Sequence, residues 1–239
     1  MDDNAYSHSI DKTIRYRTDD AVYQVHEYNL DLKANHIYLM GEPQYIVGAG
    51  VDETAEPGVE FSMANRFIKN LNVLMRKSGD PILIHMKTCG GDFSEGMAIF
   101  DAIKACPNEV AILSYTHARS MSSIIFCAAE RRIMMPHSTF MIHQGATGFE
   151  GTYKQFQTAA AQDSLYNDQM LNVYIDTLRK AGSMKKWSRK RIREFLTIQM
   201  EKKEEVYFSA TQAVKLGFAD AVFGADGTWD WSSLLAFDK

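Results

Sequence analysis

The apolar positions of this chain fall into short runs that alternate with helical spacings. The short runs predict strands at His36–Met40, Pro81–Met86, Val110–Tyr115, Arg132–Met135 and Thr139–His143. Apolar residues three and four positions apart predict helices at Phe61–Lys77, Ser94–Ala105 and Met121–Ala129. The face of the first helix that we expect to be buried carries Phe61, Ala64, Ile68, Leu71 and Met75. This alternation is typical of an α/β domain with a mainly parallel sheet.

A longer helical pattern occupies the second half of the chain. Tyr166, Met170, Tyr174 and Leu178 recur every four residues, so we expect one long helix at about 152–180. The pattern breaks at Gly182. The elements expected after it are a helix at 187–200, a strand near Val206, a helix at 209–216 and a strand at 219–223.

The two ends of the sequence differ in character. Residues 1–35 carry scattered aromatic residues and many charges without a sustained period, which indicates an N-terminal arm that is irregular and could be mobile. Residues 36–239 suffice for the core of one α/β domain. We therefore expect an arm followed by a single domain.

Composition narrows the possible functions. The 26 Lys and Arg against 30 Asp and Glu give a net charge of −4, so no general attraction for nucleic acid is expected. Three cysteines without a close pair suggest neither a disulfide framework nor a zinc site. The N-terminus lacks the apolar stretch of a secretory signal, and no apolar run is long enough to cross a membrane. We expect a cytoplasmic protein.

Gly90 and Gly91 form a turn between a predicted strand and a predicted helix. Their bare backbone N–H groups could approach a ligand closely. Ordinary turn chemistry explains such a pair equally well. No G-K-[ST] follows, which excludes a phosphate-binding loop.

Ser120 and His143 are the candidate nucleophile and base. Ser120 precedes an apolar helix, where it could cap the helix or present its hydroxyl to a substrate beside the N–H of Met121. His143 ends an apolar strand, where it could be structural or could accept the proton of Ser120. Local sequence leaves both pairs of roles open.

The order of these three signals resembles the Clp proteolytic-subunit family over about 36–223. The matching segments are Gly90-Gly91 with Gly96–Asp101, Ala118–Met121, Met-Ile-His-Gln at 141–144, and Phe208–Asp220. The resemblance implies an α/β fold of the ClpP/crotonase-like type. This fold has repeated β-β-α units, a mainly parallel sheet and a protruding long "handle" helix, here in the region of about 146–200.

Carried over residue by residue, the resemblance implies an active site. Ser120 would be the nucleophile, His143 the base, and the N–H groups of Gly91 and Met121 the oxyanion hole. The third member of the family's catalytic set is an Asp, and the aligned position here is Glu205, with Glu204 adjacent. A glutamate can orient an imidazole, but its side chain is one methylene longer. A solvated charge run at 201–205 is the competing interpretation.

Other positions depart from the family pattern. Thr88-Cys89 replaces Ser-Pro before the glycines, and Arg119 replaces a small residue before the nucleophile. The region between His143 and Glu205 is longer than in the family. Its basic run at 189–193 is expected to be a polar helix face.

The leading hypothesis is a serine endopeptidase subunit that needs neither metal nor organic cofactor. The resemblance implies a homo-oligomer of two stacked rings, usually of seven subunits each. An ATP-driven AAA+ unfoldase would feed it unfolded polypeptides. One alternative is a non-catalytic ring subunit that assembles with an active paralogue, as Arg119 and Glu205 suggest. Another is a lyase of the enoyl-CoA hydratase type, which shares the broad architecture.

Overall fold

The structure is a computed structural model that describes residues 12–41, 56–145 and 148–225. The start of the predicted arm and the end of the predicted domain lie outside the described residues. The elements in chain order are α1 (Lys12–Tyr28), β1 (Leu30–Asp31), β2 (His36–Met40), α2 (Phe61–Lys77), β3 (Ile82–Thr88), α3 (Phe93–Ala105), β4 (Val110–Arg119), α4 (Met121–Phe126), β5 (Arg131–Met134), β6 (Thr139–His143), α5 (Tyr153–Leu178), α6 (Arg189–Lys203), β7 (Glu205–Ser209), α7 (Ala210–Leu216) and β8 (Ala221–Val222).

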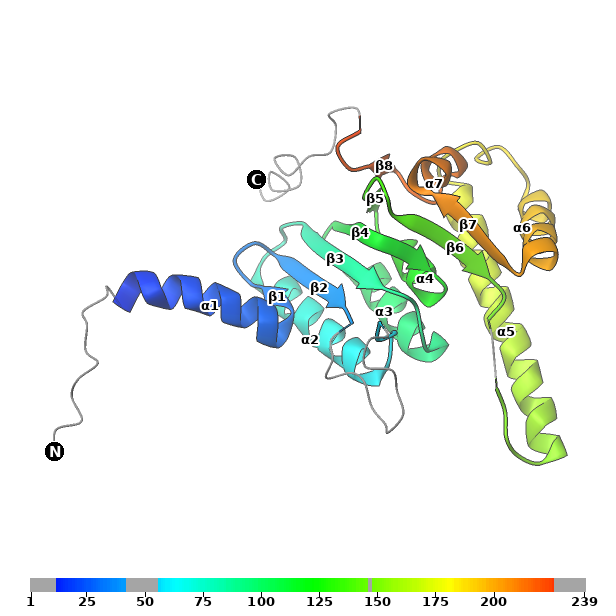
Figure 1. Cartoon of the computed structure of the whole chain (residues 1–239), viewed down its shortest axis with the longest axis horizontal. Helices are drawn as coiled ribbons and strands as arrows, with labels where there is room; N and C mark the ends of the chain where they lie inside the picture. Colours follow the sequence, from blue (N-terminus) through cyan, green and yellow to red (C-terminus); the bar gives the residue numbers. More distant parts are fainter. Residues whose placement is uncertain (1–11, 42–55, 146–147, 226–239) are drawn as a thin grey trace.

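The mainly parallel sheet is confirmed. Its strands follow the order β1-β2-β3-β4-β5-β8, and β6 joins β4 to β7 outside this path (Figure 1). The pairs β1–β2 and β6–β7 are antiparallel, and the others are parallel. Strand β4 is long enough to have two partners on one edge: its first half pairs with β5 and its last residues pair with β6.

The two faces of the sheet are covered differently. Ile84, Met86 and Ile112 belong to the main core together with buried residues of α2, α3 and α4. The alternate positions Leu83 and Leu113 point to the opposite face and form a smaller cluster there. Strands β3 and β4 therefore rest on a core that lies mostly on one side of the sheet.

Helix α2 has the predicted bounds, but its buried face differs from the prediction. Phe61 is 65% exposed, whereas Met63, Phe67 and Leu74 are buried. Two apolar series overlap in this helix, and both contain Leu71. Sequence spacing cannot choose between such series, because only the position of the sheet decides which one is covered.

Part of the predicted N-terminal arm forms regular secondary structure, where an irregular segment was expected. Helix α1 spans Lys12–Tyr28, and the short strand β1 pairs with β2. Leu30 is 8% exposed and belongs to the main core. The helix projects away from the sheet (Figure 1). The sequence did not predict α1 because a helix with few contacts to the core needs no regular spacing of apolar residues.

Helix α5 confirms the long helix of the second half and projects beyond the sheet (Figure 1). Thr152 and Gln155 form a capping box at its N-terminus. Its buried residues begin only at Met170, so the first half leaves the body of the domain. No helix in the described ranges is both long enough and apolar enough to cross a lipid bilayer.

The basic run at 189–193 forms the first turn of α6 and is a polar helix face, as predicted, and it also makes specific contacts. Arg189 pairs with Asp176, and Arg193 pairs with Asp168 at 2.8 Å. The guanidinium of Arg191 lies 3.9 Å from the ring centroid of Trp187. Because the first two partners lie on α5, the run attaches α6 to the long helix.

An ion pair with a buried arginine connects β5 to the segment before β8, where the side chain of Asp220 is 34% exposed. Arg132, with a side chain 5% exposed, donates to both carboxylate oxygens of Asp220 at 2.6 and 3.0 Å. It also donates to the carbonyl oxygen of Gly217 at 3.2 Å. A buried guanidinium without its carboxylate is costly because it has lost water as well.

Asp220→Ala should therefore lower the free energy of unfolding by about 3–5 kcal/mol. Glu109→Ala is the matched control, because Glu109 pairs with Arg131 where both side chains are about 40% exposed (39% and 41%), and its cost should be about 0–1 kcal/mol. Urea unfolding followed by circular dichroism at one protein concentration would compare them. Equal losses in the two variants would contradict the assigned importance of the Arg132–Asp220 pair.

Candidate active site

Ser120 lies at the sharp turn between β4 and α4, in a backbone conformation that is unusual for a residue with a side chain. Its φ is 53° and its ψ is −132°. Such conformations cost about 1–3 kcal/mol and occur most often at functional sites. Ser120 occupies the N-cap position, but its side chain makes no capping hydrogen bond. The capping interpretation of this serine is therefore wrong, and the hydroxyl is available for another partner.

That partner is His143. The Oγ atom of Ser120 lies 2.8 Å from Nε2 of His143. The parallel pairing of β4 with β6 explains this contact: Arg119 pairs with Met141, and the N–H of Ser120 donates to the carbonyl oxygen of Met141 at 3.3 Å. The two candidates, which are 23 positions apart in the sequence, are thus brought together by strand register.

The surroundings of His143 favour the neutral imidazole. Partial burial lowers its pKa, and the negative charge of Glu205 raises it, with burial prevailing. A neutral imidazole can accept a proton. At neutral pH the ring is therefore in the state that a general base requires.

A second serine holds the nucleophile turn in place. Ser122 Oγ is fully buried and lies 2.8 Å from the carbonyl oxygen of Thr88 and 2.7 Å from that of Arg119. It also accepts a hydrogen bond from the N–H of Arg119 at 3.0 Å. One hydroxyl thus connects the end of β3 to the turn that carries Ser120.

The two glycines face this turn at close range. Gly90 has a φ of +98°, and a Cβ there would lie 2.7 Å from the Cβ of Ser120. Gly91 has a φ of +149°, and a Cβ there would lie 2.2 Å from the carbonyl oxygen of Val59. Val59 N donates to Gly90 O at 2.6 Å, and Val59 O accepts from Asp92 N at 2.9 Å. Only glycine fits between the nucleophile turn and the Val59 segment.

A cavity of about 370 Å³ opens beside the serine and the histidine. Gly91 and Met121, the two residues expected to form an oxyanion hole, both line it. Apolar side chains, among them Ile124 and Met170, form much of the wall, and Asp163 of α5 also faces the space. The cavity can therefore receive a side chain of a bound peptide next to the nucleophile.

Glu205 lies beside His143 but is not hydrogen-bonded to it. The antiparallel register of β6 and β7 places the two residues directly opposite each other, a spacing of about 4.5–5.5 Å between Cα atoms. Among the described residues, the hydrogen bond of the Glu205 carboxylate comes from the Tyr207 hydroxyl, at 2.7 Å. Glu204 ends α6 with a φ of 60°. The register thus brings Glu205, and not Glu204, opposite the histidine.

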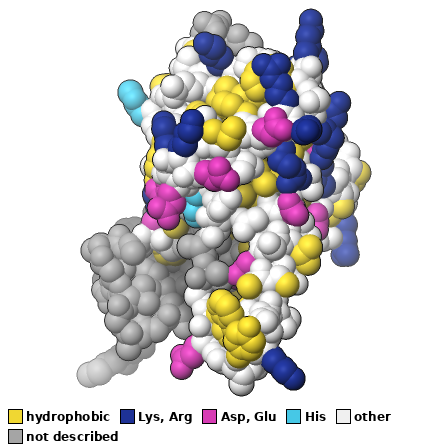
Figure 2. Space-filling view, turned by 90° about the vertical axis from the view of Figure 1, so that its right-hand side faces the viewer, with side chains coloured by type: hydrophobic (Ala, Val, Ile, Leu, Met, Phe, Trp, Pro, Cys, Tyr) yellow, Lys and Arg dark blue, Asp and Glu magenta, His cyan; other side chains and the backbone are white. Residues whose placement is uncertain are grey.

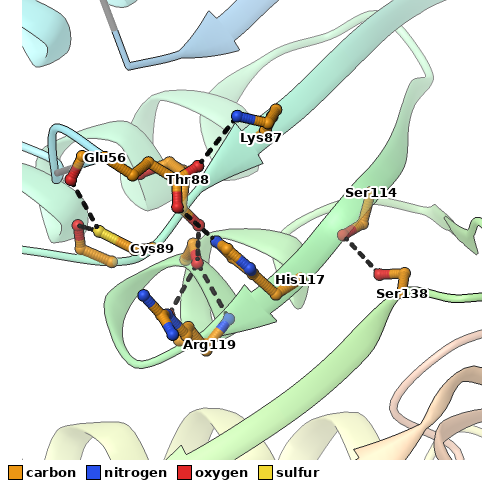
Figure 3. Close-up of polar contacts among 10 residues, drawn as sticks. Glu56, Lys87, Thr88, Cys89, Ser114, His117, Arg119 and Ser138 are labelled. Atoms are coloured by element: carbon orange, nitrogen blue, oxygen red, sulfur yellow. Dashed lines mark hydrogen bonds and ion pairs between the residues drawn. The ribbon is translucent and has the colours of Figure 1, made fainter. Parts of the chain in front are cut away.

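A further polar cluster lies behind the nucleophile turn (Figure 3). Glu56 Oε2 lies 2.8 Å from Nε2 of His117, and Glu56 Oε1 lies 3.6 Å from Nζ of Lys87. The thiol of Cys89 donates to the carbonyl oxygen of Glu56 at 3.5 Å. Burial lowers the pKa of His117 although Glu56 opposes it. The cluster attaches the segment that leads to Val59 to the ends of β3 and β4.

The sequence missed several contributors to this site. Ser122 could not be singled out because it lies among other serines. Val59 and the α5 residues that line the cavity are far from Ser120 in the sequence. Tyr207 could have been found, because residues two apart on a strand point to the same side and Glu205 was already a candidate. In the described ranges, His, Cys, Asp and Glu side chains form no group of three or more that could hold a metal ion.

Comparison with known proteins gives a consistent result. The model of the Clp protease family matches residues 54–226. The chain is 28% identical over 167 residues to the ATP-dependent Clp protease proteolytic subunit 2 of Thermobifida fusca. The aligned residues cover 69% of this chain and 76% of that protein. This chain is 30% identical over 169 residues to proteolytic subunit 1 of Frankia casuarinae, covering 69% and 72%.

The fold is also similar to a solved structure. A point mutant of ClpP1 from Listeria monocytogenes superposes with a TM-score of 0.63 and 18% sequence identity, covering 85% of this chain and 96% of that one. At this identity the match supports the fold alone. The predicted fold class is confirmed.

The reactivity of Ser120 should depend on pH through His143. Because burial lowers the pKa of this histidine, the rate of labelling by a fluorophosphonate should rise with pH and level off at an inflection below about 6.5, the ordinary histidine value. Glu205→Gln should move the inflection to lower pH, since the charge that raises the pKa is lost. Labelling at constant probe concentration between pH 4.5 and 8.5 would measure it. An inflection above the ordinary value would contradict the assigned environment.

Proposed function

Because this chain belongs to the Clp protease family, we propose that it is a serine-type endopeptidase subunit of an ATP-dependent Clp protease that cuts unfolded polypeptides into short peptides. The observation that carries the proposal is the 2.8 Å contact between Ser120 Oγ and His143 Nε2, beside a cavity. A serine hydroxyl is a weak nucleophile until a base accepts its proton.

The proposed reaction follows from this geometry. Ser120 Oγ attacks the peptide carbonyl carbon while His143 Nε2 takes the hydroxyl proton, and the N–H groups of Gly91 and Met121 bind the resulting oxyanion. His143 then gives the proton to the leaving amine, which breaks the C–N bond. Water then attacks the carbonyl carbon of the acyl-enzyme while His143 takes its proton, and His143 returns this proton to Ser120 Oγ as the ester C–O bond breaks. Apart from the peptide and water, these steps use only groups of this chain.

Glu205 is the proposed third member of the catalytic set. Its negative charge acts on the His143 ring and favours the protonated form that appears during the reaction. The register of β6 and β7 supports the assignment. The longer side chain of a glutamate must then be held in a suitable conformation.

The family further suggests the assembly. We propose a homo-oligomer, in the form of two stacked rings, fed by an AAA+ unfoldase. Tyr153 and Phe156 near the projecting end of α5 are 74% and 54% exposed, and Figure 2 shows apolar side chains gathered at this end. An exposed apolar group on a projecting helix is suited to contact with another subunit, which supports α5 as the contact between rings.

Ser120→Ala should abolish peptide hydrolysis without dissolving the assembly. We expect the rate of casein or fluorogenic-peptide cleavage to fall at least about 1,000-fold, since removal of a serine nucleophile leaves only residual catalysis. Ser62→Ala, at an exposed position of α2, is the control and should retain full activity. Native mass spectrometry would verify that both variants have the wild-type subunit number. An unchanged cleavage rate in Ser120→Ala would exclude the mechanism.

A non-catalytic ring subunit is the second candidate. The hydrogen bond of the Glu205 carboxylate to Tyr207, and not to His143, favours it. The family match is to Clp proteases and does not support the enoyl-CoA hydratase alternative. Turnover of an acyl-CoA thioester would be needed to revive that alternative.

Mixed rings would separate the first two candidates. For an active peptidase, the homomeric protein should label at Ser120 and cleave peptides without a partner. For a non-catalytic subunit, the homomer should be silent, and activity should appear only with an active paralogue and survive Ser120→Ala in this chain. Peptide cleavage by purified homomeric and mixed rings, with subunit ratios checked by native mass spectrometry, is the measurement.

A further inference from the structure

We propose that Tyr207 is a positioning residue that holds the Glu205 carboxylate beside His143, and that Arg119 in turn holds the Tyr207 hydroxyl. This inference rests on the proposed peptidase function and concerns the same site. It assigns a role to Tyr207, which the sequence did not single out, and to Arg119, which departs from the family pattern.

The strand register carries the argument. Glu205 and Tyr207 are two residues apart on β7, so their side chains point to the same face. Glu205 pairs with His143 and Tyr207 pairs with Met141, while Met141 also pairs with Arg119 on its other side. Arg119 and Tyr207 therefore flank the same residue of β6, next to the Ser120 turn and one same-face step from the histidine.

The hydrogen bond gives Tyr207 a specific action on Glu205. The Tyr207 hydroxyl donates to Oε2 of Glu205 at 2.7 Å. A carboxylate has two acceptor oxygens, so Oε1 stays available to a donor from the imidazole. Glu205 is exposed, and an exposed glutamate would otherwise distribute over several rotamers. The tyrosine thus restricts the side chain that is one methylene longer than the family's aspartate.

Arg119 acts on the same hydroxyl. The hydrogen bond to the Glu205 carboxylate raises the pKa of Tyr207, and the nearby positive charge of Arg119 opposes that rise. Since Arg119 and Tyr207 also pair with Met141 from its two sides, the guanidinium lies where it can hold the phenol oxygen. Two departures from the family pattern, Arg119 and Glu205, meet in this way at one tyrosine.

If Tyr207 instead held Glu205 away from His143, its removal would change the His143 pKa and the reaction rate in the opposite direction. The same bond could act as a latch that keeps the carboxylate away from His143. Releasing a latch would bring Glu205 closer to the histidine, which would raise the His143 pKa and speed the reaction. Releasing a positioning contact would let Glu205 move away from His143, which would lower the His143 pKa and slow the reaction.

The test is Tyr207→Phe in the full-length assembled protein. We expect the second-order rate of Ser120 labelling by a fluorophosphonate to fall about threefold to tenfold, the usual effect of one lost hydrogen bond. The inflection of the pH profile should move down, toward that of Glu205→Gln. Tyr23→Phe, at a 54% exposed position of α1, is the matched control and should behave like the wild type.

A double variant removes the remaining ambiguity. If Tyr207 acts through Glu205, then Tyr207→Phe should have no further effect in the Glu205→Gln background. A general loosening of the strand would slow both backgrounds equally and leave the inflection in place. The other ionisable groups around the site are unchanged in these Tyr207 and Glu205 variants: Asp92, Asp163 and Tyr166 line the cavity with His143, and Arg119 lies near Tyr207.

The role of Arg119 is tested with two substitutions, one that removes its positive charge and one that keeps it. Arg119→Gln should slow labelling about twofold to fivefold and lower the inflection in the same direction, and Arg119→Lys should restore part of the rate. Wild-type rates in both Tyr207→Phe and Arg119→Gln, or a faster Tyr207→Phe, would overturn the inference. Absence of Ser120 labelling in the wild type would instead refute the proposed function, so the two failures can be distinguished.

Discussion

The whole site depends on the pairing of one strand edge with two different strands. The first half of β4 pairs with β5, and its last residues pair with β6. Strand β6 can therefore leave the path of the main sheet and carry β7 with it. Ser120 directly follows β4, His143 ends β6 and Glu205 begins β7. Because hydrogen-bond registers fix these three strand ends against each other, the candidate residues need no flexible loop to meet.

Backbone restraint around the serine is the second requirement. Ser120 adopts a positive φ, which is unfavourable for a residue with a side chain. Several neighbours hold it there: the buried hydroxyl of Ser122 binds both adjoining segments, and Gly90 packs against the turn. Val59 fixes the glycine loop from the other side. The strain persists because the surroundings determine the conformation completely.

The electrostatics of the site combine opposing effects on one imidazole. Partial burial lowers the pKa of His143, and the carboxylate of Glu205 raises it. A base that is neutral at rest but whose charged form is stabilised during the reaction needs both effects. The hydrogen bond between Tyr207 and Glu205 can adjust how strongly the carboxylate acts on His143, and it leaves the burial of the imidazole unchanged.

The sequence by itself determined the order of the elements from β2 onward, because apolar runs and helical spacings are local. Motifs of contiguous residues also singled out Ser120 and His143 as candidates. The sequence could not decide which apolar series of α2 is buried, nor whether Ser120 caps a helix, because both depend on atoms far along the chain. The tertiary structure alone placed Glu205 opposite His143 and gave Tyr207 its partner. The physical reason is that strand register and side-chain distances are set by pairing between distant segments, about which local spacing carries no information.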